Sequence, residues 1–140
     1  EKIKTGSDIT VVSYGSTLKI VEKAAIELEK FNISCEIIDC QSLIPFDLGN
    51  NIYESIKKTN RVIIIDEDFS GGASAYILDN LINKQNIYDY LDSKPHTLSA
   101  QDHRPAYGTD GDYFSKPSVD EVFNRIYSIM NELNPKKYPI

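Results

Sequence analysis

Two stretches of the sequence hold residue types that could do chemistry. In "DHRPAYG", His103 has an ordinary pKa of about 6.5, which suits proton transfer near neutral pH, and Arg104 could bind a carboxylate through two parallel hydrogen bonds. The alternative is a loop held by its own hydrogen bonds, with Arg104 paired to a nearby aspartate. Both interpretations stay open, because functional residues concentrate on loops that a rigid scaffold carries.

The second stretch is "DEDFSGGAS", in which Gly71 and Gly72 come just before a helical pattern. A glycine pair in that position lets the backbone approach a partner closely and presents N–H groups that could bind an anion. The three carboxylates just upstream, Asp66, Glu67 and Asp68, would oppose a phosphate, however, and no dinucleotide fingerprint or phosphate-loop lysine is present. We therefore favour tight packing of this segment against another chain or domain over a phosphate site.

A metal site and a serine nucleophile are both poorly supported. Cys35 and Cys40 lie five positions apart in an apolar segment, without the spacing of a zinc or redox motif, and we expect them to be buried and reduced. Asp110 and Asp112 could bind a hard cation, but they lack the spacing of the known calcium loop. His96 precedes an expected strand and is interpreted as structural. No Gly-x-Ser-x-Gly pattern occurs.

The segment 99–118 is polar, without apolar periodicity, and reads as one long loop. Loops of this size inside a compact domain are uncommon, and they are usually functional or disordered. Its aromatic residues Tyr107, Tyr113 and Phe114 are of a type enriched at interfaces, although a loop folded onto its own domain would use them too.

The elements that must position these residues alternate along the chain. Strands are expected over 7–15, 34–40, 61–68 and 95–100, and helices follow the first three and the long loop. The first helix places Leu18, Val21, Ala24, Ala25, Leu28 and Phe31 on one face, with Ser16 or Thr17 as its cap, and Asp47 can cap the second. The last begins at Ser118, with Glu121 completing a capping box. This order predicts an α/β fold, a three-layer α/β/α domain around a mostly parallel sheet.

Composition excludes several classes of protein. The 140 residues suit a single domain, 1–140, with a core of about 6–133 and a frayed tail over 134–140. With 15 Lys and Arg against 21 Asp and Glu, and no basic stripe, nucleic acid is a poor partner. No apolar run approaches the roughly 20 residues that span a bilayer, so we expect no membrane association. A cytoplasmic location is a separate expectation. The chain starts without methionine, and we expect an excised piece of a longer polypeptide.

Three stretches together resemble a known family: "GSDITVVSYGSTLKIVEKAAIELEKFNISCEIIDCQSLIPFD", "SIKKTNRVIIIDEDFSGGASAYI" and "YLDSKPHTLSAQDHRPAYG". They are similar to the C-terminal domain of the transketolase-like, thiamine diphosphate-dependent 2-oxoacid dehydrogenases. The closer likeness is to the beta subunit, or beta-like half, of the first component of pyruvate and branched-chain 2-oxoacid dehydrogenase complexes. The resemblance extends from about Gly6 to Leu133.

The resemblance implies a sheet of about five strands and an assembly role. Thiamine diphosphate and magnesium would bind to other domains, so this domain alone would be inactive and would bind no cofactor directly. Its partners would be other domains or the alpha subunit of the same enzyme, a second copy in a two-fold homodimer, and the dihydrolipoyl acyltransferase core. His103 and Arg104 would then lie near the active-site entrance, and Glu67, Asp68, Gly71, Gly72, Tyr107, Tyr113 and Phe114 would serve interfaces or structure.

The sequence departs from the family pattern at three places. Gln41 stands where the family commonly has an arginine, Asp66 stands where the family often has a histidine before its glutamate, and "DHRPAYG" stands where relatives tend to have Asp-Thr-Pro. The preferred 2-oxoacid therefore cannot be carried over. Transketolase and deoxyxylulose phosphate synthase share the domain type, and a stand-alone nucleotide- or flavin-binding module is a further alternative.

Overall fold

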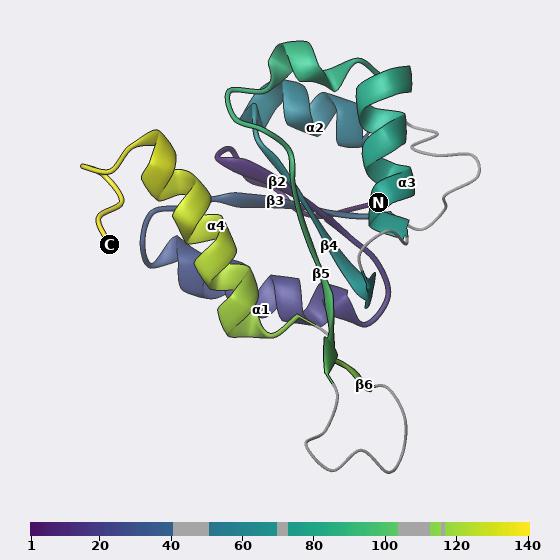
Figure 1. The fold of residues 1–140 in the computed structure, drawn as a ribbon. Coiled ribbons are helices and arrows are strands. Elements are labelled where there is room, and N and C mark those ends of the chain that lie inside the picture. The colour runs from purple at the N-terminus through teal and green to yellow at the C-terminus, as the bar shows by residue number, and fades with distance from the viewer. Residues whose placement is uncertain (41–50, 70–72, 104–112, 116) are drawn as a thin grey trace.

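The computed structural model describes residues 1–40, 51–69, 73–103, 113–115 and 117–140. Figure 1 shows a central sheet with helices on both faces, as the sequence predicts. In chain order the elements are β1 (Lys2–Lys4), β2 (Ile9–Ser13), α1 (Thr17–Glu29), β3 (Cys35–Asp39), α2 (Asn51–Thr59), β4 (Val62–Phe69), α3 (Ala73–Asp79), the π-helix η1 (Asn80–Lys84), the 3-10 helix η2 (Ile87–Tyr90), β5 (His96–His103), β6 (Tyr113–Ser115) and α4 (Val119–Leu133).

The sheet has the strand order β1-β3-β2-β4-β5-β6. Its four central strands are parallel, and the two short outer strands, β1 and β6, run antiparallel to their neighbours. The aliphatic run of β4 is buried from both sides: Ile63 and Ile65 pack with α1 and α4, whereas Val62 and Ile64 pack with α2 and α3. This two-sided burial explains why the run lacks apolar and polar alternation.

The helices follow the expected apolar faces, with two corrections in the first. In α1 the residues Val21, Ala24, Ala25 and Leu28 are buried, but Phe31 lies beyond the helix and is 48% exposed, packing edge-on against Phe123. Neither predicted cap acts on α1, because Ser16 makes no capping hydrogen bond and the Thr17 hydroxyl donates to the carbonyl of Tyr14 instead. The predicted capping box of α4 is confirmed, since Ser118 and Glu121 each bind the other's backbone.

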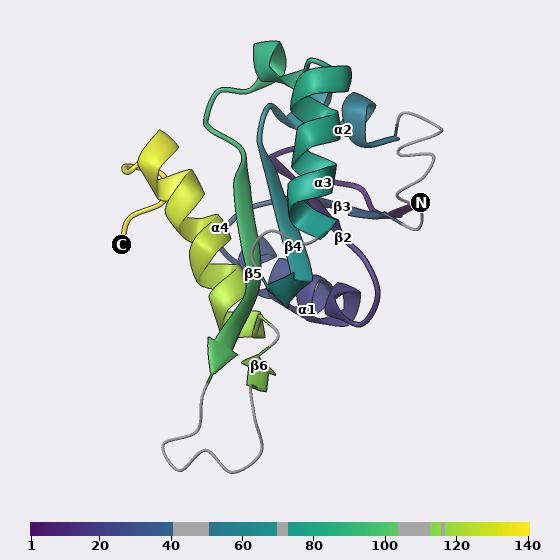
Figure 2. The ribbon, with the colours of Figure 1, turned by 45° about the vertical axis from the view of Figure 1, so that its right-hand side comes forward.

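Two expectations about irregular segments were wrong. β5 continues to His103, and β6 pairs with it over Gln101–His103, so the flanks of the expected loop 99–118 are strands that extend the sheet to six (Figure 2). The C-terminal tail is not frayed: Tyr138 is 3% exposed, and its carbonyl accepts a hydrogen bond from Asn131. Within the described residues, no helix is long and apolar enough to cross a membrane.

Candidate active-site edge

The carboxyl ends of β2 and β4 meet at one edge of the sheet, where ligands and partners of open parallel sheets gather. Two side chains join these ends: the hydroxyl of Tyr14, just after β2, donates a hydrogen bond to Oδ1 of Asp66 in β4. Asp66 is fully buried, and Tyr14 is partly exposed. Acidic side chains are seldom fully buried unless they have a polar partner, and the Tyr14 hydroxyl supplies such a partner to Asp66.

The turn between β2 and α1 brings Tyr14 to this position. Gly15 has a φ of 64°, in the left-handed region that glycine adopts without steric cost. Below the turn, Ser13 donates to the carbonyl of Ile65 at 2.9 Å and lies 2.7 Å from the Thr17 hydroxyl, which itself donates to the carbonyl of Tyr14. These short contacts tie the start of α1 to β2 and β4.

This cluster suits positioning better than nucleophilic attack. Ser13 and Thr17 are fully buried, and their hydroxyl protons are used within the fold. Asp66 and Tyr14 instead fix the end of β4, which leads into the predicted glycine pair. The arrangement can hold the rim of an active site in place, and we assign it no bond-making step.

The predicted site residues fall into two groups. Glu67 and Asp68 lie in β4, beyond Asp66, and only their backbone is described. His103 and Tyr113 are opposite each other in the β5–β6 register, and Phe114 is opposite Asp102, so these three lie on strands rather than in a loop. The predicted site residues Gly71, Gly72, Arg104 and Tyr107 lie outside the described part of the chain. The same holds for Gln41, Asp110, Asp112 and the predicted helix cap Asp47.

A second polar cluster, which the sequence analysis did not recognise, surrounds Glu36 near the amino end of β3. Glu36 is fully buried, and its Oε1 accepts from Lys58 Nζ and from the backbone N–H of Gly6 at 3.2 Å, with Lys2 Nζ 3.5 Å away. Burial alone would raise the pKa of the Glu36 carboxyl, but hydrogen bonds from Lys58, Ser55 and Gly6 hold that pKa below its ordinary value. A charged residue inside the apolar run "SCEIIDC" was the signal available in the sequence.

Next to Glu36 lies a buried group of hydroxyls. Thr10 Oγ1 lies 2.6 Å from Ser55 Oγ and 2.7 Å from Thr59 Oγ1, and the Thr59 hydroxyl donates to the carbonyl of Arg61. These contacts fasten α2 to β2. Because hydroxyls buried without partners are costly, this hydrogen-bonded group stabilises the layer in one arrangement.

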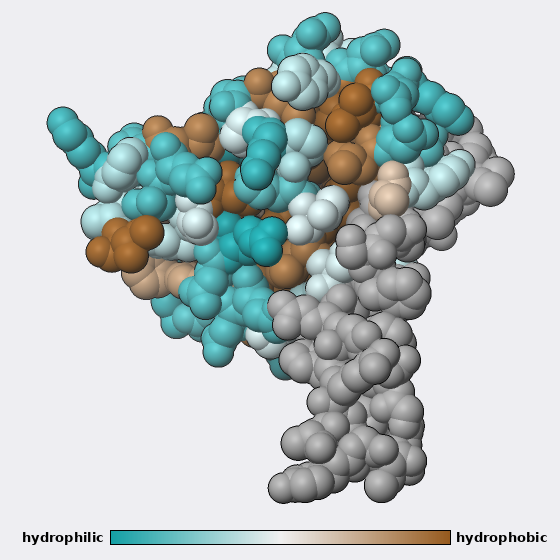
Figure 3. Space-filling model, in the orientation of Figure 1, coloured by the Kyte–Doolittle hydropathy of each residue, from teal (hydrophilic) through white to brown (hydrophobic). Residues whose placement is uncertain are grey.

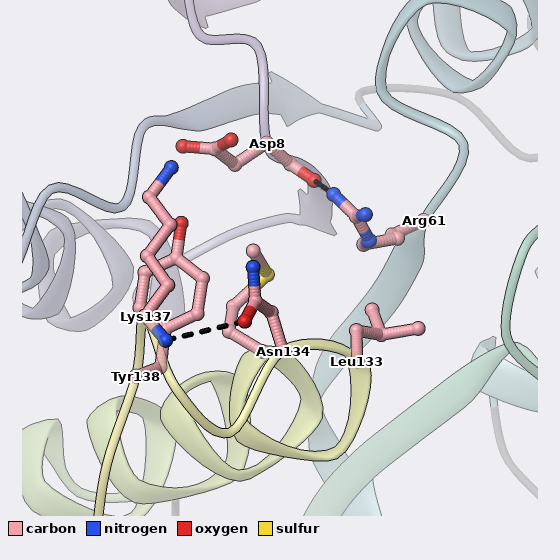
Figure 4. Close-up of a pocket in the computed structure, with 7 residues that line it drawn as sticks. Asp8, Arg61, Leu133, Asn134, Lys137 and Tyr138 are labelled. Carbon is pink, nitrogen blue, oxygen red and sulfur yellow. Dashed lines mark hydrogen bonds between the residues drawn. The ribbon is translucent and has the colours of Figure 1, made fainter.

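A small cavity of about 220 Å³ also opens at the amino end of the sheet, lined by Asp8, Arg61, Met130, Leu133, Asn134, Lys137 and Tyr138 (Figure 4). Arg61 is engaged there, since Nη1 donates to the carbonyl of Asp8 at 2.9 Å and Nη2 contacts the Asp92 carboxylate at 3.0 Å. The cavity lies at the opposite end from Tyr14 and Asp66, because Asp8 and Arg61 precede β2 and β4. Arg61 thus anchors the loops before the two strands.

His96 also lies at the amino end, as the first residue of β5 and opposite Ile63 in β4. Burial lowers the pKa of His96, and the nearby charges of Lys94 and Arg125 lower it further. This position, away from the carboxyl edge, agrees with the structural role inferred for His96.

Among the residues that the structure describes, no group of three or more His, Cys, Asp or Glu side chains is placed to hold a metal ion.

Comparison with known proteins gives a consistent result. The family description "Transketolase, C-terminal domain" matches residues 1–116. The "Pyruvate dehydrogenase E1 component subunit beta" of Rickettsia bellii (strain RML369-C) is 32% identical over 128 residues, which cover 91% of this chain and 38% of that protein. The "2-oxoisovalerate dehydrogenase subunit beta 2, mitochondrial" of Arabidopsis thaliana is 41% identical over 85 residues, 60% of this chain and 24% of that protein.

A solved structure described as "Split gene transketolase, inactive beta4 tetramer" has the same fold, with a TM-score of 0.68 and 21% identity over 91% of this chain and 40% of that chain. This likeness concerns the fold alone. The chain thus spans about two fifths or less of the length of these relatives.

Proposed function

Because this chain belongs to the transketolase C-terminal domain family, we propose that it is the C-terminal domain of a thiamine diphosphate-dependent 2-oxoacid dehydrogenase, in its beta subunit or the beta-like half of a fused chain. The observation that carries the proposal is the similarity to a pyruvate dehydrogenase beta subunit over 91% of this chain. The similarity to a 2-oxoisovalerate dehydrogenase beta subunit supports branched-chain 2-oxoacids as a second proposed substrate class beside pyruvate.

In this enzyme the domain would support assembly and border the active site. Thiamine diphosphate and magnesium would be held by other parts of the enzyme and would supply the carbanion chemistry of decarboxylation. The chain's own residues would act at the carboxyl edge, where Tyr14 and Asp66 hold the end of β4. The isolated chain would therefore be folded and without turnover.

The proposed partners are an alpha subunit or alpha-like domains, a second copy of this domain, and a dihydrolipoyl acyltransferase core. The relatives support the first of these, because they are beta subunits of pyruvate dehydrogenase E1 components. We also propose a cytoplasmic location, for which the two buried free cysteines are the supporting observation. Cell fractionation with a specific antibody would test this location.

The test of the function is an activity assay on the complete natural enzyme with any partner subunit. The assay follows reduction of an artificial electron acceptor by pyruvate or 3-methyl-2-oxobutanoate, with and without thiamine diphosphate and magnesium. Turnover that needs both the acid and the cofactor is expected, and the preferred acid would identify the substrate class. Lack of turnover in a folded, assembled sample would favour a transketolase-type reaction or a binding module.

Residues His103 and Arg104 are proposed to lie near the active-site entrance. Replacing both with alanine in the complete enzyme should raise KM for the 2-oxoacid or weaken assembly. His96→Ala is a matched control, because His96 lies at the amino end of β5. If assembly and turnover of the double variant equalled those of the wild type, the proposed role of this pair would be wrong.

A further inference from the structure

The first half of β5 has an open outer edge. β4 pairs with β5 through His96–Leu98, and β6 pairs with its other side only over Gln101–His103 (Figures 1 and 2). The register of β6 would next bring Pro117 opposite Ser99, and a proline has no N–H to donate to a neighbouring strand. In the described part of the chain, no strand therefore covers Thr97–Ser99 on this side.

The backbone groups on this edge point away from the sheet. The carbonyl of Thr97 accepts a hydrogen bond from Arg125 Nη1 in α4 at 3.1 Å, so the polar groups of Thr97 face outward. Because these directions alternate along a strand, those of Ser99 face outward as well. Among the described residues, the Thr97 and Ser99 amides have no partner on the outer side, and an exposed row of this kind is a template for pairing with another strand.

Space for an added strand lies beside this edge. A groove of about 340 Å³ runs between β5 and α4, lined by Leu98, Glu121, Asn124, Arg125 and Ser128. Figure 3 shows hydrophobic surface on the same side of the molecule, between the positions of β5 and α3. The partly buried Leu78 and Ile82 belong to α3 and η1. An added strand would thus meet polar side chains on one face of the sheet and apolar ones on the other.

We propose that two copies of this chain pair antiparallel along β5, with Thr97 of each copy opposite Ser99 of the other. A two-fold axis at Leu98 places Thr97 and Ser99 of one strand opposite Ser99 and Thr97 of the other. The four backbone N–H groups and four carbonyls of these residues can then form hydrogen bonds across the two strands. Such a contact uses the same patch on both copies and closes as a dimer. This inference rests on the two-fold assembly within the proposed function and names the surface that forms it.

The charges beside the edge agree with a second copy as the occupant. The same axis would place the α4 helices of the two copies on one face of the joined sheet and antiparallel to each other. Arg125 of one copy can then leave its own Thr97 carbonyl and face Glu121 of the other. Because of the two-fold symmetry, this Arg125–Glu121 contact forms twice in the dimer. A single copy therefore carries both charges needed for a complementary contact.

The test uses the full chain and the substitution Thr97→Pro, which removes an outward N–H without removing a hydrogen bond to β4. Sedimentation equilibrium should give a wild-type dimer whose dissociation constant rises about tenfold or more in the variant, while circular dichroism and the urea midpoint stay unchanged. Thr97→Val keeps the N–H and the branched side chain, and this control should dimerise like the wild type.

A second measurement does not depend on the folding of the proline variant. A mixture of Thr97→Cys and Ser99→Cys chains should form a disulfide-linked pair under mild oxidation, because residues opposite each other have Cα atoms about 5.5 Å apart. Either variant alone should cross-link far less. A wild-type chain that stays monomeric up to about 1 mM, or a mixture that does not cross-link, would overturn the proposal. Neither result would bear on turnover of the complete enzyme, so the two proposals can fail separately.

Discussion

The hydroxyl of Tyr14 donates a hydrogen bond to the fully buried carboxylate of Asp66, joining the carboxyl ends of β2 and β4. This hydrogen bond fixes the position of the end of β4 relative to β2.

Replacing Tyr14 with phenylalanine removes this donor and keeps the ring. Leaving a buried acceptor without its hydrogen-bond donor costs about 1–3 kcal/mol, so the free energy of unfolding should fall by about 2 kcal/mol in urea titrations. Tyr88→Phe is the matched control, because Tyr88 is 66% exposed and its loss of a hydroxyl should change the free energy by less than about 0.5 kcal/mol. Equal midpoints for the two variants would contradict this role of Tyr14.

Gly6 cannot take a side chain. A Cβ at Gly6 would lie 2.2 Å from the carbonyl carbon of Cys35, a backbone atom that cannot move aside locally. Gly6→Ala should therefore lower the free energy of unfolding by about 3 kcal/mol, measured by urea denaturation. Ser7→Ala, one residue away, keeps the backbone N–H that binds Ser34 and should stay within about 0.5 kcal/mol of the wild type. A Gly6→Ala protein as stable as Ser7→Ala would refute the steric argument.

Stability should decrease in acid because of Glu36. Hydrogen bonds hold the pKa of Glu36 below its ordinary value despite burial, so the unfolded chain binds a proton first as the pH falls. The stabilisation is complete above the ordinary value of 4.5 and is lost as the pH falls through the lower folded value. Urea midpoints between pH 6 and 3 should fall less steeply for Glu36→Gln than for the wild type. Parallel curves would show that Glu36 does not carry this dependence.

His96 should affect the pH dependence of stability at a higher pH than Glu36 does. Its pKa is lowered by burial and by the nearby Lys94 and Arg125, so the unfolded state binds the proton first. Stability should therefore fall as the pH drops below the ordinary value of 6.5. An NMR titration should give a His96 midpoint below 6.5, with the signal assigned through its loss in His96→Gln. A midpoint at or above 6.5 would mean that the folded site does not disfavour the charged ring.

Much of the fold could be predicted from the sequence because apolar periodicity reports burial directly. The aliphatic run of β4 and the capping box of Ser118 and Glu121 are local signals, and both led to correct elements. β6 was missed because its three residues are held by pairing with Gln101–His103 rather than by their own pattern. The ordered C-terminal tail was missed for a similar reason. Tyr138 is buried by tertiary contacts with α4, and the local sequence pattern does not reveal such contacts.

The site was predicted less completely than the fold. Parallel strands end at one edge of a sheet, which places Tyr14 and Asp66 in the same region, but their hydrogen bond depends on the geometry of the Gly15 turn. Glu36 and its partners Gly6 and Lys58 are far apart in the sequence, so only the folded chain unites them. The roles proposed for Glu67, Gly71, Gly72, Arg104 and Tyr107 stay predictions.

The most direct test of the account is release of carbon dioxide from a 2-oxoacid labelled at its carboxyl carbon by the complete natural enzyme. A 2-oxoacid dehydrogenase first component should release label from pyruvate or 3-methyl-2-oxobutanoate only with thiamine diphosphate and magnesium, and the isolated chain should release none. If the complete, assembled enzyme released no label but transferred two-carbon units between sugar phosphates, the central claim would be contradicted.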